Sequence, residues 1–303
     1  MNRTPPDDVR RLLRQEVGFG CPADDCDSPY LTWHHFDPQW SKRQQHDPAG
    51  IVALCVQHHG EADHGVWTPD QLRAFKDPSR NRAAERVRGR FRWKRDRLIL
   101  LAGGNWWTGC SILLRCDPIP IIWLSHDSDG YELLNLDLFD ETGSARLSLR
   151  DNDWVVDRDV EDLECAPRKT ALSVRTAALG AELSISFQRA EPQLVLENAT
   201  RIARAGRREM QRGMERQLAS APPAFRAAVL ESLSAYSAEA RAEESARFLL
   251  DGIAVEDSAL CVIEGRLRWP VDIALEPTRI VLPRQNVLSG GVAKNAKVGI
   301  QIN

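Results

Sequence analysis

The chain has 303 residues, of which 43% are hydrophobic and 27% are charged, and its formal net charge is -3 at pH 7. This length is typical of two or more domains. No apolar run is long enough to span a membrane, which excludes an integral helical membrane protein. The slightly negative total does not suggest a constitutive nucleic-acid binder, so any basic surface has to be local.

The first residues, Met1 to Asp8, contain no apolar core of the kind that a signal peptide has. We therefore expect a cytoplasmic protein whose thiols stay reduced. The segment from Cys21 to Asp63 holds three of the seven cysteines and five of the seven histidines. Packing alone does not explain so many cysteines and histidines in one segment. Their concentration predicts metal binding.

Four of these ligands predict a structural zinc site. Three thiolates and one imidazole suit tetrahedral zinc, and the short spacing of Cys55 and His58 is common in zinc knuckles. Cys21 and Cys26 lie in a loop rich in Pro, Asp and Ser that can form a knuckle. A disulfide between Cys21 and Cys26 is the alternative, which a reducing cytoplasm disfavours. The predicted zinc ligands are Cys21, Cys26, Cys55 and His58.

The remaining histidines and one carboxylate predict a second metal site with open positions. His59 and Asp63 are four residues apart, so they share one face if their segment is helical. Residues 32–35 predict a short strand, on which His34 and His35 point to opposite sides. One histidine can then bind a metal while the other faces a substrate.

Residues 8–76 resemble an HNH endonuclease domain, whose fold is called ββα-metal. The motifs that carry the resemblance are R-R-L-L-R-Q-E-V-G-F-G-C-P-A-D-D-C, L-T-W-H-H-F-D-P and G-I-V-A-L-C-V-Q-H-H-G-E-A-D-H-G. The resemblance implies that His35 is the general base of phosphodiester hydrolysis. It also implies that His34 and His59, with Asp63 one helical turn on, hold a catalytic Mg²⁺, Mn²⁺ or Ni²⁺ ion, while zinc is structural. No family resemblance is recognised for residues 98–303.

The chain departs from the HNH pattern at one position. Five residues before the knuckle cysteine the family usually has Asn, and this chain has Gly50. That Asn orients the base or helps to hold the ion, so its loss predicts a weaker site. Asp47 or His46 in the preceding loop could substitute for it. We expect Gly50→Asn to be structurally mild, because Asn tolerates a positive φ better than most residues.

Basic residues gather in two places. The run from Arg80 to Arg97 reads R-N-R-A-A-E-R-V-R-G-R-F-R-W-K-R-D-R, which predicts either phosphate contacts or a solvated linker. Three arginines near the N-terminus lie at helical spacing and could add a basic face beside the site. The residues expected to bind nucleic acid are Arg10, Arg11, Arg14, Arg88, Arg90, Arg92, Lys94 and Arg95.

Beyond the basic run, short apolar or alternating segments with tight turns are typical of an antiparallel β domain. We expect strands at 98–101, 111–114, 119–124, 133–139, 184–187 and 194–196. From about Ala199 to Asp251 the pattern predicts an αα-hairpin, whose second helix runs from Ala224 through Leu250. Its arginines predict phosphate contacts or a solvated face, and its single apolar stripe is also typical of an oligomerising or docking helix.

These patterns predict an α+β fold. An N-terminal ββα-metal HNH domain with a zinc knuckle (1–78) precedes a basic linker (79–97) and an antiparallel β-rich region (98–303) with an inserted αα-hairpin at about 199–251. The expected function is a metal-dependent endonuclease acting on DNA, whose C-terminal region serves regulation, targeting or oligomerisation. By analogy with other HNH domains, bacterial genome defence or mobile elements would suit it. The alternative is a zinc-bearing, catalytically weakened nucleic-acid-binding or scaffold protein. Expected partners are DNA and a second copy or another protein at the helical hairpin, with no membrane.

Overall fold

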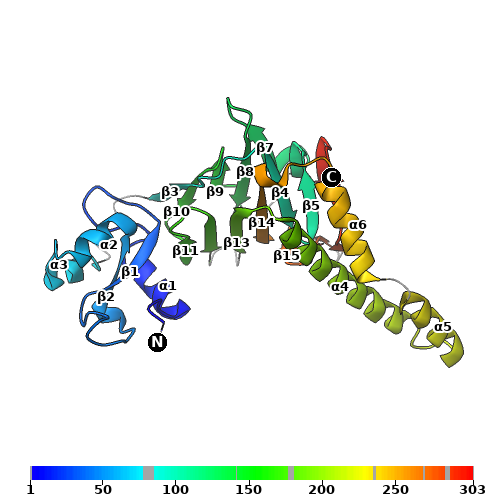
Figure 1. Ribbon diagram of the computed structural model, residues 1–303, viewed down its shortest axis with the longest axis horizontal. Helices are drawn as coiled ribbons and strands as arrows, with labels where there is room; N and C mark the ends of the chain where they lie inside the picture. The colour runs from blue at the N-terminus through cyan, green and yellow to red at the C-terminus, as the bar shows by residue number, and fades with distance from the viewer. Residues whose placement is uncertain are drawn as a thin grey trace. The chain divides into compact units, whose positions relative to one another are not determined.

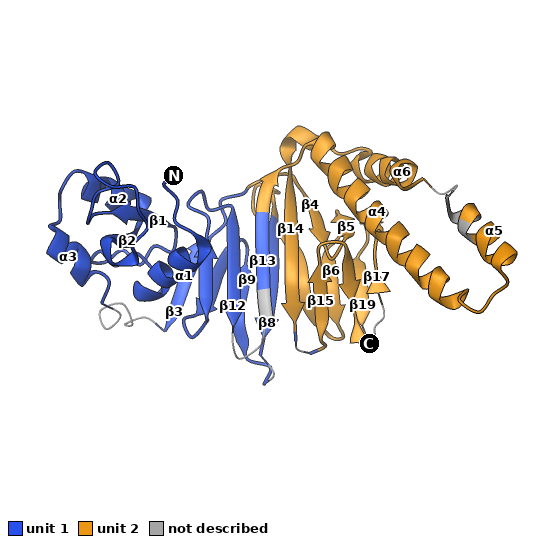
Figure 2. Cartoon of the chain, turned by 90° about the horizontal axis from the view of Figure 1, so that it is seen from below, with its two compact units in different colours: residues 1–93, 133–186, 268–270 blue, residues 94–132, 187–267, 271–303 orange. Residues whose placement is uncertain are grey.

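The computed structural model describes residues 2–77, 85–140, 142–176, 181–234, 237–268, 270–283 and 287–302. The chain forms two compact units, coloured separately in Figure 2, with the elements labelled in Figure 1. Unit 1 comprises residues 1–93, 133–186 and 268–270, and unit 2 comprises residues 94–132, 187–267 and 271–303. Each unit is therefore assembled from segments that are far apart in the sequence.

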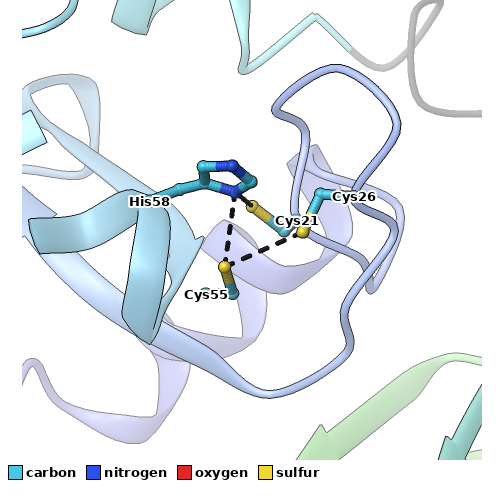
Figure 3. A group of neighbouring side chains, drawn as sticks. All are labelled: Cys21, Cys26, Cys55 and His58. Carbon is cyan, nitrogen blue, oxygen red and sulfur yellow. Dashed lines mark hydrogen bonds between the residues drawn. The ribbon is translucent and has the colours of Figure 1, made fainter. Parts of the chain in front are cut away.

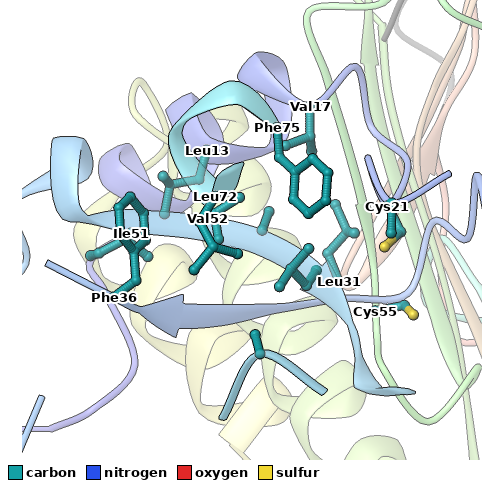
Figure 4. Packing of buried hydrophobic residues seen from close by; sticks show 14 residues of the cluster. Leu13, Val17, Cys21, Leu31, Phe36, Ile51, Val52, Cys55, Leu72 and Phe75 are labelled. Carbon is teal, nitrogen blue, oxygen red and sulfur yellow. The ribbon is translucent and has the colours of Figure 1, made fainter. Parts of the chain in front are cut away.

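The N-terminal part of unit 1 is a two-stranded antiparallel hairpin accompanied by short helices. Its elements are α1 (Asp7–Glu16), β1 (Leu31–His35), the 3-10 turn η1 (Pro48–Gly50), β2 (Ile51–Cys55), α2 (Val56–Asp63) and α3 (Pro69–Ala74). All five residues of β2 are buried, and Leu31 pairs with Cys55 while His35 pairs with Ile51. Helices and hairpin share one core (Figure 4), which includes Leu13, Val17, Leu31, Phe36, Val52, Leu72 and Phe75.

The remainder of unit 1 consists of antiparallel strands. One run is β8 (Glu132–Phe139), β9 (Ala145–Arg150), β10 (Asp153–Asp157) and β3 (Arg86–Arg90), and another is β11 (Asp162–Cys165), β12 (Ala171–Thr176) and β13 (Ala181–Arg189). Trp154 on β10 is 1% exposed and packs edge-on against Tyr30, at 6.5 Å between ring centroids. A Cβ on Gly89 would lie 2.1 Å from the Trp154 ring, so a glycine there makes room for the indole.

Helix α1 is joined to β11 by ion pairs. The Arg14 guanidinium donates to both carboxylate oxygens of Asp162, at 2.9 and 2.6 Å, and Arg10 donates to Glu164 at 2.8 Å. Arg14 is 4% exposed, so its charge requires this bidentate partner. These contacts join residues about 150 positions apart and make the N-terminal helix part of the same unit as the strands.

The expectation of an α+β chain with an N-terminal ββα-metal domain followed by a β domain is wrong. The described residues are mostly β-rich, with 19 strands in sheets of two, seven and ten strands. The N-terminal residues share their compact unit with strands from residues 133–186. Part of the expected basic linker, Arg86–Arg90, is strand β3, while residues 79–84 lie outside the described residues. A single sequence does not reveal this architecture, because the contacts that join the N-terminal residues to the strands of residues 133–186 are between positions far apart in the chain.

Unit 2 combines further strands with three helices. Its strands are β4 (Arg97–Ala102), β5 (Asn105–Thr108), β6 (Ile112–Cys116), β7 (Ile119–His126), β14 (Ser258–Leu267), β15 (Ile273–Glu276), β16 (Arg279–Val281), β17 (Val287–Leu288), β18 (Val292–Lys294) and β19 (Val298–Ile302). Strands β14 to β17 form an antiparallel run, and β4 pairs in parallel with β14. Parallel pairs also join β18 to β5 and β19 to β6, so this unit is not purely antiparallel.

The helices of unit 2 are α4 (Pro192–Gln217), α5 (Pro223–Ser234) and α6 (Ala238–Leu250), with the 3-10 turn η2 (Val255–Asp257) after them. Helix α4 lies beside α6 (Figure 1), and both contribute to one core with β4 and β14. Residues 194–196, expected as a strand, belong to α4, because Pro192 begins a helix there. The expected single second helix is two helices, since Ser237 caps a new start at α6. Among the helices of the described residues, none combines the length and apolarity that crossing a bilayer requires.

Candidate metal centre

The β1–β2 hairpin and the helix after it bring the two sets of ligands together. Cys55 is the last residue of β2 and the N-cap of α2, so His58 follows it one helical turn on. The loop between α1 and β1 carries Cys21 and Cys26. His34 and His35 are the last two residues of β1, where they pair with Val52 and Ile51 at the start of β2.

The first group contains three thiols and one imidazole (Figure 3). His58 Nδ1 lies 3.3 Å from the sulfurs of both Cys21 and Cys55, and the sulfur of Cys26 lies 3.7 Å from that of Cys55. Ligand atoms around a tetrahedral zinc, at about 2.3 Å for sulfur and 2.0–2.1 Å for nitrogen, lie about 3.6–3.8 Å from one another. The donor set and its spacing therefore fit a metal ion such as zinc.

The electrostatics of this group are consistent with such an ion. Burial raises the pKa of the Cys21 thiol and of the Cys26 thiol, and the nearby Cys55 sulfur adds to both shifts. A bound cation reverses this preference, because it stabilises the thiolate form. Trp67 packs edge-on against the His58 ring at 5.7 Å between centroids and belongs to the border of the core, so the ligand helix is held by packing as well.

The second group consists of His34, His59 and Asp63, whose ligand atoms all lie within 4.8 Å of one another. His34 Nδ1 lies 3.1 Å from one Asp63 oxygen, and His59 Nε2 lies 3.7 Å from the other. The buried His34 Nδ1 approaches its Asp63 oxygen as an ion pair but makes no regular hydrogen bond to any described residue. A buried ring nitrogen and a carboxylate oxygen that approach without bonding fit a cation placed between them.

Thr32 sets the protonation of His59. Its hydroxyl donates to the Leu54 carbonyl at 3.0 Å and lies 2.7 Å from His59 Nδ1. Because the single hydroxyl proton is used by Leu54, His59 Nδ1 has to be the donor to the Thr32 oxygen. The lone pair of neutral His59 is then on Nε2, the nitrogen that faces Asp63. Burial lowers the pKa of His59 and of His34, which favours the neutral, metal-binding form of both rings.

His35 points into a different cluster from His34. Its ring lies 4.9 Å from Trp40 and 5.5 Å from His46 between centroids, and its Nε2 is 3.4 Å from His46 Nδ1. His46 Nε2 lies 3.0 Å from the Asn2 carbonyl, to which it donates. With Nε2 as its donor, His46 accepts at Nδ1 from His35 Nε2–H, which leaves the lone pair of His35 on its own Nδ1. Burial, followed by the proximity of His46, lowers the pKa of His35 to about 4, so this imidazole is neutral at pH 7.

The structure leaves no space for a side chain at Gly50. A Cβ at this position would lie 1.6 Å from the Asp37 carbonyl oxygen, and Gly50 is not among the residues with a positive φ. The expectation that Gly50→Asn is mild is therefore wrong, because backbone occupies the space. Of the two candidate substitutes, Asp47 caps η1 by accepting from Ala49 N–H at 3.0 Å, while His46 contacts the His35 ring.

The arginines expected to bind nucleic acid have different surroundings. Arg10 and Arg14 are paired with carboxylates of β11, and Arg11 lies 3.9 Å from Glu161. On and after β3, Arg90 is paired with Asp153, whereas Arg88 and Arg92 are exposed. In unit 2, Lys94 donates to Asp127 at 2.8 Å and Arg95 donates to the Lys94 carbonyl.

Several contacts near the ligands carry no sequence signal. Asn2 and Trp40 stand in no motif, and Thr32, although it lies within the quoted L-T-W-H-H-F-D-P motif, was given no role there; only their positions around the histidines reveal them. Arg3 was also missed, although its charge lowers the pKa of all three histidines, His34, His35 and His59. No family model, curated protein or solved structure matches the chain. Its function therefore has to be inferred from the geometry of these two groups.

Proposed function

We propose that this protein is a metal-dependent endonuclease of the HNH type that hydrolyses phosphodiester bonds in DNA. The observation that carries the proposal is the convergence of His34, His59 and Asp63, whose possible ligand atoms lie within 4.8 Å of one another, next to a neutral His35.

In this proposal each side chain has a separate task. His35 Nδ1 accepts a proton from the attacking water, and the His46–Asn2 chain keeps that nitrogen unprotonated. A divalent ion held by His34, His59 and Asp63 would supply stabilisation of negative charge on the scissile phosphate and the leaving oxygen. Two imidazoles and one carboxylate suit Mn²⁺, Ni²⁺ or Zn²⁺ as well as Mg²⁺.

The group of Cys21, Cys26, Cys55 and His58 has a structural role in this proposal. All four positions of a tetrahedral zinc are filled by protein ligands, so none is left for substrate. The zinc would join the loop after α1 to the start of α2, the helix that carries His59 and Asp63. We assign DNA as the substrate, and unit 2 as a regulatory, targeting or oligomerising part through α4 and α6.

Incubating the purified chain with plasmid DNA and Mg²⁺, Mn²⁺ or Ni²⁺ tests the proposal. The wild type is expected to convert supercoiled plasmid to nicked or linear forms, and His35→Ala is expected to slow this by about 10²–10⁴-fold with unchanged zinc content. No cleavage by the wild type with any of the three ions would refute the nuclease. A zinc-bearing binding or scaffold protein would then be the remaining function.

A further inference from the structure

A pocket of about 550 Å³ opens beside the second metal group, entirely within unit 1. Thr32 and His59 contribute to its wall, so it adjoins the ligands directly. An apolar part is formed by Pro29, Leu31 and Trp33. The end of β11 contributes Glu164 and Cys165, the segment after it contributes Ala166 and Pro167, and the N-terminal segment contributes Arg3 and Thr4.

The positive charges of this pocket are not equivalent. Arg10 and Arg14 line it, but both are paired with carboxylates of β11. Arg3 is exposed and forms an ion pair with no carboxylate of the described residues. Its neighbour Asn2 accepts a hydrogen bond from His46, which anchors this segment next to His35. Arg3 is thus the cation of this lining with no carboxylate partner among the described residues, and it is near enough to His34, His35 and His59 for its charge to act on all three.

We propose that this pocket binds one unstacked nucleotide of the substrate, with its base against Trp33 and the apolar wall and its phosphate on Arg3. Aromatic and apolar side chains offer a surface for the face of any base, and a guanidinium binds phosphate oxygens in bidentate fashion. A base inside a duplex has both faces covered by its neighbours, so only an unstacked base can use such a wall. The inference rests on the proposed nuclease function, and it assigns single-stranded or frayed DNA as the preferred substrate.

Binding can be measured without cleavage. Full-length His35→Ala protein is titrated into a fluorescently labelled single-stranded oligonucleotide and, separately, into the blunt duplex of the same sequence, and anisotropy gives each Kd. The single strand is expected to bind more tightly than the duplex. Adding Arg3→Gln or Trp33→Leu is expected to weaken single-strand binding by about 5- to 100-fold. Arg226→Gln, the same charge change at an exposed position on α5, is the matched control and is expected to have no effect.

Three outcomes overturn the proposal. The first is tighter binding of the duplex than of the single strand. The second is unchanged single-strand affinity in both pocket variants with their zinc content preserved. The third is equal competition by inorganic phosphate and by a nucleoside 5′-monophosphate, which would show a site for phosphate only. The His35→Ala change removes the proposed general base but none of the residues that line the pocket, so binding and cleavage are tested separately. Absence of cleavage by the wild type would refute the nuclease without changing the binding result.

Discussion

Replacing Gly50 tests whether the chain excludes a side chain at the position where the HNH pattern has Asn. The Cβ of any other residue would lie 1.6 Å from the Asp37 oxygen and 2.6 Å from its carbonyl carbon, whereas real contacts of this kind begin at 3.0 Å. No rotamer relieves the clash, because both atoms belong to the backbone. The Asp37 carbonyl and Gly50 have to separate by about 1.4 Å.

That separation also breaks local hydrogen bonds. The Gly50 carbonyl accepts from Phe36 N–H at 2.9 Å and from Asp37 N–H at 3.2 Å, which joins the end of β1 to the start of β2. Overpacking costs about 1–3 kcal/mol, and each lost bond costs about 0.5–1.5 kcal/mol. We therefore expect Gly50→Ala and Gly50→Asn to destabilise unit 1 by about 2–6 kcal/mol.

Urea unfolding followed by tryptophan fluorescence measures this loss, with Gly60→Ala as the matched control. Gly60 lies in α2 of the same unit, and its Cβ would have no neighbour within 4 Å. A Gly to Ala change inside a helix stabilises it by about 0.5–1 kcal/mol. Equal stability of Gly50→Ala and Gly60→Ala would refute the account of the β1–β2 junction and would reopen Gly50 as a site for Asn.

Three further substitutions test separate contacts. Metal analysis of Cys26→Ser is expected to show that bound zinc falls from about one per chain to near zero. The control is Cys116→Ser, which changes a buried cysteine of β6 outside both metal groups of the described residues and is expected to keep the zinc. Zinc retained in Cys26→Ser would contradict the ligand assignment. Arg14→Gln leaves the Asp162 carboxylate without its charged partner and is expected to destabilise the fold by about 3 kcal/mol in urea unfolding. Arg11→Gln on the same helix is expected to cost less than about 1 kcal/mol, and equal effects would refute the distinction. Thr32→Val removes the group that fixes the His59 tautomer and is expected to weaken Mn²⁺ binding by about 10- to 100-fold in calorimetry, so unchanged affinity would exclude that role.

Donor types and spacing made the two groups of side chains that could hold a metal ion predictable. Cys55 and His58 are separated by one helical turn, and His59 and Asp63 by another, so a local helix is sufficient to place them. The strand alternation likewise separated His34 from His35, and the structure directs them to different clusters. Individual strands such as β4, β6 and β8 were also predictable from their apolar runs.

The architecture was not predictable in the same way, because it depends on contacts between distant residues. Arg14 and Asp162 are 148 positions apart, and neither carries a signal that names the other. Arginines dominate the composition of residues 79–97 and therefore predict a linker, whereas in the structure Val87 on β3 and Phe91 just after it are buried. The space around Gly50 is filled by the backbone of Asp37, which a single sequence cannot reveal.

Anomalous diffraction from crystals of the full chain soaked in Mn²⁺ tests the central claim most directly. Data at the zinc and manganese edges are expected to show a zinc peak enclosed by Cys21, Cys26, Cys55 and His58 and a separate manganese peak in contact with His34, His59 and Asp63. Manganese absent from the second group, with His34 hydrogen-bonded to Asp63 in its place, would contradict a catalytic metal site and with it the proposed nuclease.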